Sequence, residues 1–128
     1  MVRLTAPDGS QATINGALVV RIRPTVSGEN ADAKTRIDWA IMSLVKEAVE
    51  EIVPLVRSEL ESLATLTALK GRKFWFDAKQ AVGPLPITSA QKDSGFNSSI
   101  KIMGYRQYVI ESDDEGRAVI SAAGGTPL

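Results

Sequence analysis

The segment Lys73–Asp77 (KFWFD) holds the side chains best suited to bind a partner. In a β-strand, alternate side chains point to opposite faces, so Phe74 and Phe76 are predicted on one face and Trp75 on the other. Tryptophan is enriched at the energetic centres of protein interfaces, so an outward Trp75, with Lys73 beside it, would suit a protein partner. The alternative interpretation is that Trp75 packs against the other half of the chain.

A second candidate lies in the polar segment Gln91–Ser98 (QKDSGFNS). Phe96 is the only large apolar side chain in it. Such a side chain is either tucked onto the protein or left exposed for a partner. The predicted interaction surface therefore comprises Trp75, Phe96, Lys73 and Gln91.

Nucleic-acid binding is an alternative because three basic residues, Lys70, Arg72 and Lys73, lie close to Trp75 in the sequence. Cations beside an aromatic ring suit a single strand of nucleic acid. The rest of the chain argues against it, because formal net charge is zero and Asp77 lies nearby. Residues 1–62 carry nine acidic and seven basic residues, and residues 63–128 carry six and eight, so neither half has a strongly basic surface.

Catalytic and metal-binding chemistry has little support in the composition. Cysteine and histidine are both absent, which removes disulfides, thiol and imidazole zinc ligands, the commonest general base and every Ser–His or Cys–His pair. No phosphate-binding glycine loop, EF-hand loop or G-x-S-x-G turn occurs. We therefore predict a protein that is not an enzyme, with no catalytic residue, no cofactor, no metal site and no small-molecule substrate.

The chain also shows no sign of a membrane segment. The longest apolar runs are only a few residues, far short of a membrane span. The first residues lack a basic segment followed by an apolar core, so no secretory signal is expected. These features predict a cytoplasmic protein.

The opening hexapeptide "LTAPDG" (residues 4–9) returns as "LTALKG" (residues 66–71). A shift of 62 residues aligns these segments, and a shift of 64 aligns Val45, Glu47 and Glu51 with Val109, Glu111 and Glu115. Two blocks in the same order predict a tandem duplication with a small insertion. The predicted units are 1–62 and 63–124, followed by a flexible tail, 125–128.

Each unit is predicted to hold about four strands and a C-terminal helix. A turn at Gly9 or Gly71 follows the first strand, and Asn15-Gly16 is a possible tight hairpin turn in the first unit. In the second unit a hairpin is predicted from Ser99–Met103 and Arg106–Ile110, with its turn at Gly104. Ser112 and Glu115 then form the capping-box pattern of a helix start.

The segment Ile37–Val53 is ambiguous. Its apolar residues fit one face of a helix, while Ile37, Trp39 and Ile41 alternate like a strand that buries Trp39. The repeat favours a strand followed by a helix, with Pro54 near the first helical turn, where proline is tolerated. The alternative is one continuous helix ending at Pro54.

Units of this size bury little surface alone, so two copies sharing a core or a broad interface are expected. The predicted fold class is α+β, with two tandem β-rich units packed with pseudo-twofold symmetry.

The order of these residues resembles the small FlbD-type (SwrD-type) family of flagellar and swarming-motility proteins. The residues that carry the resemblance are Leu4, Thr5, Gly9, Asn15, Tyr108, Val109, Glu111, Ser112 and Glu115. Members of that family hold a single unit, whereas this chain is predicted to hold two, and Asp77 replaces Asn15 in the second. The resemblance implies an accessory or interaction protein linked to motility, acting through a protein partner or self-association. Alternatives are a small β-type nucleic-acid-binding regulator and a self-associating structural component of the kind found in phage particles.

Overall fold

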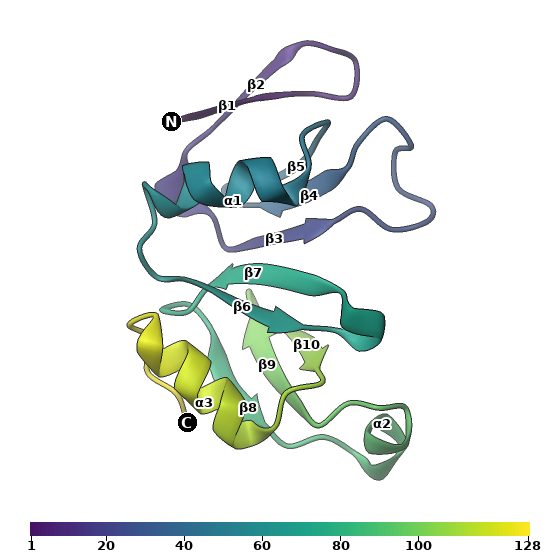
Figure 1. The fold of residues 1–128 in the computed structure, drawn as a ribbon, viewed down its shortest axis with the longest axis vertical. Coiled ribbons are helices and arrows are strands. Elements are labelled where there is room, and N and C mark those ends of the chain that lie inside the picture. The colour runs from purple at the N-terminus through teal and green to yellow at the C-terminus, as the bar shows by residue number, and fades with distance from the viewer. The chain divides into compact units, whose positions relative to one another are not determined.

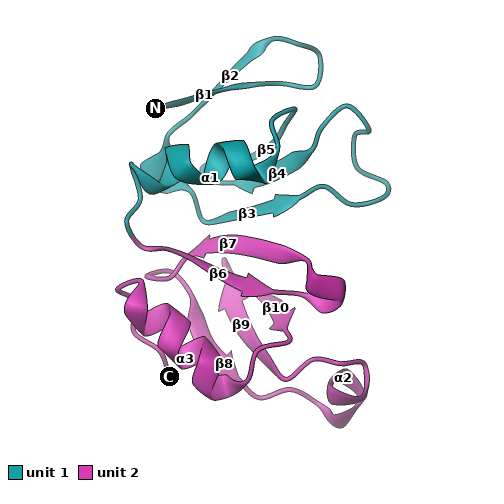
Figure 2. Ribbon diagram, in the orientation of Figure 1, with its two compact units in different colours: residues 1–61 teal, residues 62–128 magenta.

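The computed structural model describes residues 1–128 and divides the chain into two units, Met1–Glu61 and Ser62–Leu128. Figure 2 shows the two units in different colours. The sequence predicts a boundary between residues 62 and 63, one residue from the observed division. The pseudo-twofold packing of the two units stays a prediction.

Both units have the same order of elements: a β-hairpin, a three-stranded antiparallel sheet and a helix (Figure 1). In unit 1 these are β1 (Val2–Thr5), β2 (Gln11–Ile14), the 3-10 turn η1 (Gly16–Leu18), β3 (Arg21–Pro24), β4 (Thr35–Asp38), β5 (Met42–Val45) and α1 (Val49–Arg57). In unit 2 they are β6 (Leu63–Thr67), η2 (Leu69–Gly71), β7 (Lys73–Asp77), β8 (Val82–Leu85), α2 (Ser89–Asp93), β9 (Ser98–Ile102), β10 (Tyr105–Val109) and α3 (Asp113–Ala122). The fold is α+β as predicted, with five strands in each unit where the sequence predicted about four.

The opening hairpins have the same register. Val2 faces Ile14 in the β1–β2 pair, and Ala64 faces Phe76 in the β6–β7 pair, which is the same pairing moved by 62 residues. Both turns place a glycine at positive φ, Gly9 at 89° and Gly71 at 72°. A side chain would be strained in that conformation, which explains why glycine is the residue that both turns share.

The three-stranded sheets also match. Thr35 faces Val45 across β4 and β5, and Ser98 faces Val109 across β9 and β10, and all four side chains are buried. The turn between these strands covers residues 39–41 in unit 1 and residues 103–104 in unit 2. The turn of unit 2 is one residue shorter, but each of its two strands is one residue longer. The offset between the units therefore rises from 63 residues at Thr35 and Ser98 to 64 residues at Val45 and Val109.

The core of each unit lies between its sheets and its helix. Phe74 and Phe76 are buried on one face of β7, as strand alternation predicts, with ring centroids 5.6 Å apart. Ile14 is the buried counterpart of Phe76 in unit 1. The helix α1 buries Val49, Ile52, Val53 and Val56, and α3 buries Gly116 and Ile120.

The ambiguous segment folds as strands followed by a helix, and the continuous-helix alternative is wrong. Pro54 lies in the interior of α1 rather than in its first turn. Because proline has no N–H, residue 54 cannot donate the backbone hydrogen bond to the carbonyl four residues before it. The prediction that Trp39 is buried in the core is also wrong. Trp39 lies in the β4–β5 turn, half-buried, where its indole N–H donates to the Ser43 hydroxyl at 2.9 Å.

Asn15-Gly16 is not a tight hairpin turn. The Asn15 side chain accepts a hydrogen bond from the Ala17 N–H at 3.1 Å and so caps η1. Asp77 accepts from the Lys79 N–H at 3.0 Å in the same way, 62 residues later. Both side chains can make this local turn, which is why Asp77 can stand in the place of Asn15.

Two further differences concern a connection and the C-terminal end. The loop predicted at Gln91–Ser98 begins inside the short helix α2. The predicted flexible tail has backbone contacts in unit 2, because the Leu128 N–H donates to the Gly83 carbonyl at 2.8 Å and the Gly125 N–H to the Ile120 carbonyl at 2.9 Å. None of the helices combines the length and apolar character that crossing a membrane requires.

Candidate functional site

A threonine and a glutamate join the two sheets in each unit. In unit 1 the Thr5 N–H and hydroxyl both donate to the Glu47 carboxylate at 2.9 Å, and the Lys46 N–H donates to the Thr5 carbonyl at 2.8 Å. In unit 2 the Thr67 N–H donates to the Glu111 carboxylate at 2.9 Å, and the Ile110 N–H donates to the Thr67 carbonyl at 2.9 Å. We call each arrangement the Thr–Glu clamp. The clamp of unit 1 joins the end of β1 to the segment after β5, and the clamp of unit 2 joins the end of β6 to the segment after β10.

The clamp also affects the charge of its glutamate. Burial raises the pKa of the Glu47 carboxyl, but the hydrogen bonds from Thr5 outweigh burial and hold that pKa below its ordinary value. Glu47 is therefore ionised at neutral pH and acts as a fixed acceptor. This role is structural. It gives a physical reason why a threonine and a glutamate occur at matching positions in both units.

The sheet formed by β8, β9 and β10 has one buried face and one outward face. Ile100 and Ile102 lie on the buried face, on the side of α3, which contacts β8. On the outward face Lys101 pairs with Arg106 and with Val82. The next row on that face pairs Ser99 with Tyr108 and Leu85, and there Ser99 is fully buried while Tyr108 and Leu85 are half-buried. We define the cationic sheet face by six residues: Val82, Leu85, Phe96, Lys101, Arg106 and Tyr108.

Two cations face each other at the centre of this surface. Lys101 and Arg106 are directly opposite across β9 and β10, and both are exposed. Lys101 has no polar side-chain partner, and the Arg106 guanidinium donates only to the Pro86 carbonyl, at 2.9 Å. Like charges at directly opposed positions destabilise a sheet. The folded chain therefore keeps an unfavourable pair that no carboxylate neutralises.

An aromatic pair borders the two cations. Phe96 packs on Tyr108 with ring centroids 5.5 Å apart, and both rings are half-buried. The short helix α2 brings the chain to this position. Its cap is Thr88, whose hydroxyl accepts from the Gln91 N–H at 3.3 Å while the Gln91 side chain accepts from the Thr88 N–H at 2.9 Å. Gln91 thus completes a capping box, which is a structural role.

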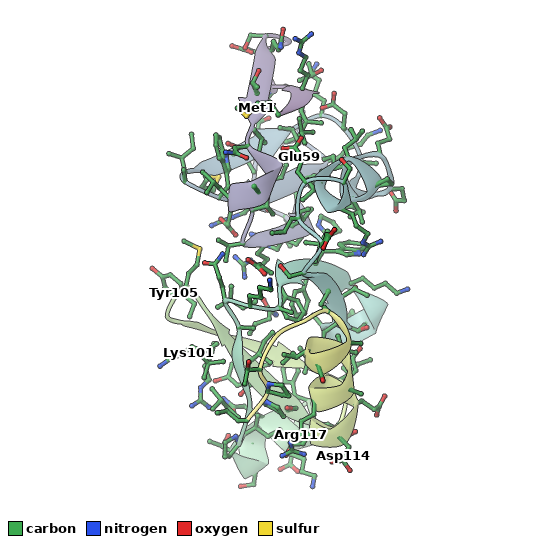
Figure 3. All side chains as sticks on the ribbon, turned by 90° about the vertical axis from the view of Figure 1, so that its left-hand side faces the viewer. Met1, Glu59, Lys101, Tyr105, Asp114 and Arg117 are labelled. Carbon is green, nitrogen blue, oxygen red and sulfur yellow. The ribbon has the colours of Figure 1, made fainter.

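The β9–β10 turn exposes apolar side chains at the end of this sheet, where Tyr105 lies on the same face as its partner Ile102 and opposite to the cationic sheet face. Tyr105 is 77% exposed and Met103 is 55% exposed. Met103 and Gly104 both have positive φ, 53° and 80°, as a two-residue hairpin turn requires. Asparagine or glycine would suit the first position, whereas methionine there costs about 1 kcal/mol. Figure 3 shows Lys101 and Tyr105 projecting away from α3, the helix that carries Asp114 and Arg117.

Trp75 and Lys73 lie on one face of β7, opposite Thr65 and Thr67 of β6. Trp75 is half-buried and Lys73 is exposed. No hydrogen bond, ion pair or ring contact joins either of them to Gln91 or Phe96. The four predicted surface residues therefore belong to two separate parts of unit 2, the β7 face and the α2 segment.

The sequence analysis missed Lys101, Arg106 and Tyr105. Their signal was present in the predicted hairpin, because residues equidistant from the Gly104 turn are opposite each other. Counting outward from a two-residue turn at Met103 and Gly104 pairs Ile102 with Tyr105 and Lys101 with Arg106, as the structure has them. The sequence prediction began the second strand one residue late, at Arg106, which hid the pairing of the two cations.

Unit 1 has two shallow hollows. One, of about 360 Å³, is lined by Met1, Val2, Arg3, Leu55, Ser58 and Glu59. The other, of about 390 Å³, is lined by Ala6, Pro7, Asp8, Asn30 and Asp32. Glu59 is held by the N-terminal ammonium at 2.8 Å, and Figure 3 shows Met1 and Glu59. No cluster of three or more histidine, cysteine, aspartate or glutamate side chains is placed to hold a metal ion.

No protein-family model matches the chain, and no curated protein or solved structure is significantly similar to it. The candidate site is thus described by its own geometry. It comprises two cations without a carboxylate partner, an aromatic pair and an exposed apolar turn on one sheet of unit 2.

Proposed function

We propose that this chain is a non-catalytic protein-interaction protein that binds its partner through the β9–β10 end of unit 2. One observation carries the proposal: the β9–β10 turn exposes Tyr105 and Met103, and Met103 occupies a backbone conformation that methionine disfavours. Tyrosine supplies a large contact area at low entropic cost and is enriched among the residues that dominate binding energy.

The resemblance to the FlbD-type family supports the same class of function. It suggests a cytoplasmic accessory protein and directs the search for a partner to flagellar and swarming proteins. The residues of the resemblance include Tyr108, which lies in β10, and Glu111, which follows that strand at the end away from the β9–β10 turn.

The test is affinity capture from an extract of the source cells, with the captured proteins quantified by mass spectrometry. Wild-type protein would be compared with Tyr105→Ser and with Ile41→Ser, a matched control. Ile41 is 64% exposed in the corresponding turn of unit 1. We expect a partner that the wild type and Ile41→Ser both retain, and that Tyr105→Ser loses.

Circular dichroism should show that all three proteins remain folded, because both side chains are exposed. If the three capture the same proteins in equal amounts, the β9–β10 turn is not the binding site. Light scattering over a range of concentrations tests the alternative of self-association. A mass that rises with concentration for the wild type but not for Tyr105→Ser would identify a second copy of the chain as the partner.

A further inference from the structure

The outward face of the β8–β9–β10 sheet has a charge pattern that the fold itself does not use. Lys101 and Arg106 repel each other across the strands, and neither contacts a carboxylate. A side chain that only solubilised the surface could be of either charge at these positions. Two opposed cations cost stability, and that cost is recovered when an anion lies between them.

The apolar residues around the two cations limit the kind of anion. Val82 adjoins Lys101 on β8 and is 47% exposed, and the half-buried Tyr108 ring lies one row away on β10. A small inorganic anion would contact only the cations. A ligand that also covers the apolar side chains must carry carboxylates and apolar groups together.

We infer that the cationic sheet face binds an acidic segment of a protein, in which Asp or Glu side chains meet Lys101 and Arg106 and an apolar side chain packs on Phe96 and Tyr108. The inference deepens the proposed function and rests on it, because it names the chemical class of the partner. Complementary charge at such a surface speeds association and selects the partner, while the aromatic contact supplies most of the affinity.

An acidic protein segment fits this surface better than nucleic acid does. A single strand of nucleic acid needs a track of cations that follows its backbone over several phosphates. The cationic sheet face offers two cations, and the chain has a formal net charge of zero. Two cations flanked by Val82 and Leu85 match a short run of carboxylates and apolar side chains.

The first experiment uses the full chain, isotope-labelled, and a synthetic peptide in which glutamate alternates with leucine. Amide NMR spectra during the titration should show shifts confined to β8–β10 and the residues around Phe96. A peptide with glutamine in place of glutamate should bind at least about fivefold more weakly, because each exposed ion pair contributes up to about 1 kcal/mol. Raising the salt concentration from about 0.05 M to about 0.5 M should weaken binding of the glutamate peptide.

Charge variants then assign the binding to the two cations. Lys101→Gln should weaken binding about threefold and Lys101→Glu about tenfold, as expected for losing and reversing one exposed charge. Lys73→Glu is the matched control: it makes the same change of net charge on the exposed end of β7, and its affinity should stay within about twofold of wild type. Lys101 makes no polar side-chain contact, so its variants should fold normally.

Equal weakening by Lys101→Glu and Lys73→Glu would overturn the inference, because the attraction would then be non-specific. No shift in β8–β10 with the glutamate peptide would overturn it as well. A poly-thymidine strand that binds more tightly than the peptide, with the same dependence on Lys101, would identify nucleic acid as the ligand. If Tyr105→Ser loses its captured partner while the acidic peptide fails to bind, the proposed function stands and only the class of partner is wrong.

Discussion

The outward face of the three-stranded sheet carries different chemistry in the two units, although the strands are antiparallel in both and only the β8–β9 pair has a shift of register. In unit 1 that face carries Arg21, Arg23, Arg36 and Asp38, and every one of these groups is paired. At the corresponding places unit 2 carries Val82, Leu85, Ser99 and Lys101. The charged side chains on the sheet of unit 1 are held in ion pairs, whereas Lys101 and Arg106 on the sheet of unit 2 have no carboxylate partner.

The loop between the first two strands of each sheet makes the difference. In unit 1 that loop brings Glu29 onto the Arg23 guanidinium through two bonds, at 2.9 and 3.0 Å, and within 3.6 Å of Arg36. In unit 2 the corresponding loop contains α2 and brings Phe96 onto Tyr108. The same connection thus covers one sheet with a carboxylate and the other with an aromatic ring. The two units thus share the order of their strands. The residues on the outward face and the loop that packs on it differ, and these set the surface chemistry of each sheet.

The largest expected effect tests whether matched core positions are equivalent. Phe76→Ala should lower the free energy of unfolding by about 3–5 kcal/mol and Ile14→Ala by about 2–5 kcal/mol, because each leaves a cavity at the same place in its hairpin. Chemical denaturation followed by circular dichroism measures both. A small loss at one position and a large loss at the other would contradict the equivalence of the two hairpins.

The Thr–Glu clamps provide the next test. Glu47→Ala and Glu111→Ala should each cost about 2 kcal/mol, because a partly buried threonine N–H loses its acceptor. The loss should be larger for Glu47, which accepts two hydrogen bonds from Thr5. Thr5→Val, which removes only the hydroxyl donor, is the control and should cost less than Glu47→Ala. If Thr5→Val cost more than Glu47→Ala, the Thr5 hydroxyl rather than its N–H would make the larger contribution to stability.

The charge network of unit 1 predicts that the stability of the folded chain depends on pH. Hydrogen bonds from Arg23 lower the pKa of Glu29 from an ordinary 4.5 to about 2. A lowered pKa stabilises the folded chain above the ordinary value, and the contribution is lost as pH falls toward about 2. Glu29→Gln should therefore cost about 1–2 kcal/mol at pH 7, and the difference from wild type should shrink progressively below pH 4.5. Thermal unfolding at several pH values would reveal a constant difference if this assignment were wrong.

The smallest effect concerns the helix starts, which differ at matched positions. Ser112 caps α3 and forms a capping box with Glu115, whereas Ala48 at the start of α1 makes no side-chain bond. Ser112→Ala should cost about 1 kcal/mol, and Ala48→Ser should gain up to about 1 kcal/mol. Melting temperatures of the two variants should move in opposite directions. An Ala48→Ser variant that melts at a lower temperature would mean that the start of α1 cannot accept the cap.

The sequence was informative wherever one residue determines a local conformation. The shared glycines, the capping box at Ser112 and the alternation of Phe74 and Phe76 predicted elements that the structure contains. The offset of 62 residues even reproduces the register of the opening hairpins. In each case the physical cause acts over a few residues, so a single sequence is enough to find it.

The rest depended on contacts between residues far apart. Trp39 was predicted in the core because it alternates with Ile37, but the β4–β5 turn interrupts the strand before it. The sequence left open whether Phe96 tucks onto the protein or stays exposed, and only the fold brings its ring onto Tyr108. Gln91 was predicted at an interaction surface, and its side chain completes the capping box of α2. Lys101 and Arg106 have ordinary positions in the sequence, and only the pairing of β9 with β10 makes them neighbours.

The Thr–Glu clamp has a consequence for synthesis on the ribosome. Thr5 and Glu47 are 42 residues apart, and Thr67 and Glu111 are 44 apart, so each clamp closes within its own unit. Because the N-terminal part of a chain folds first during translation, unit 1 can complete its sheets while unit 2 is still being made. A nascent unit 1 thus joins its own strands before strands of nearly identical register emerge behind it. That order of closure favours the hydrogen bonds between Thr5 and Glu47 over pairing of β1 with a strand of unit 2.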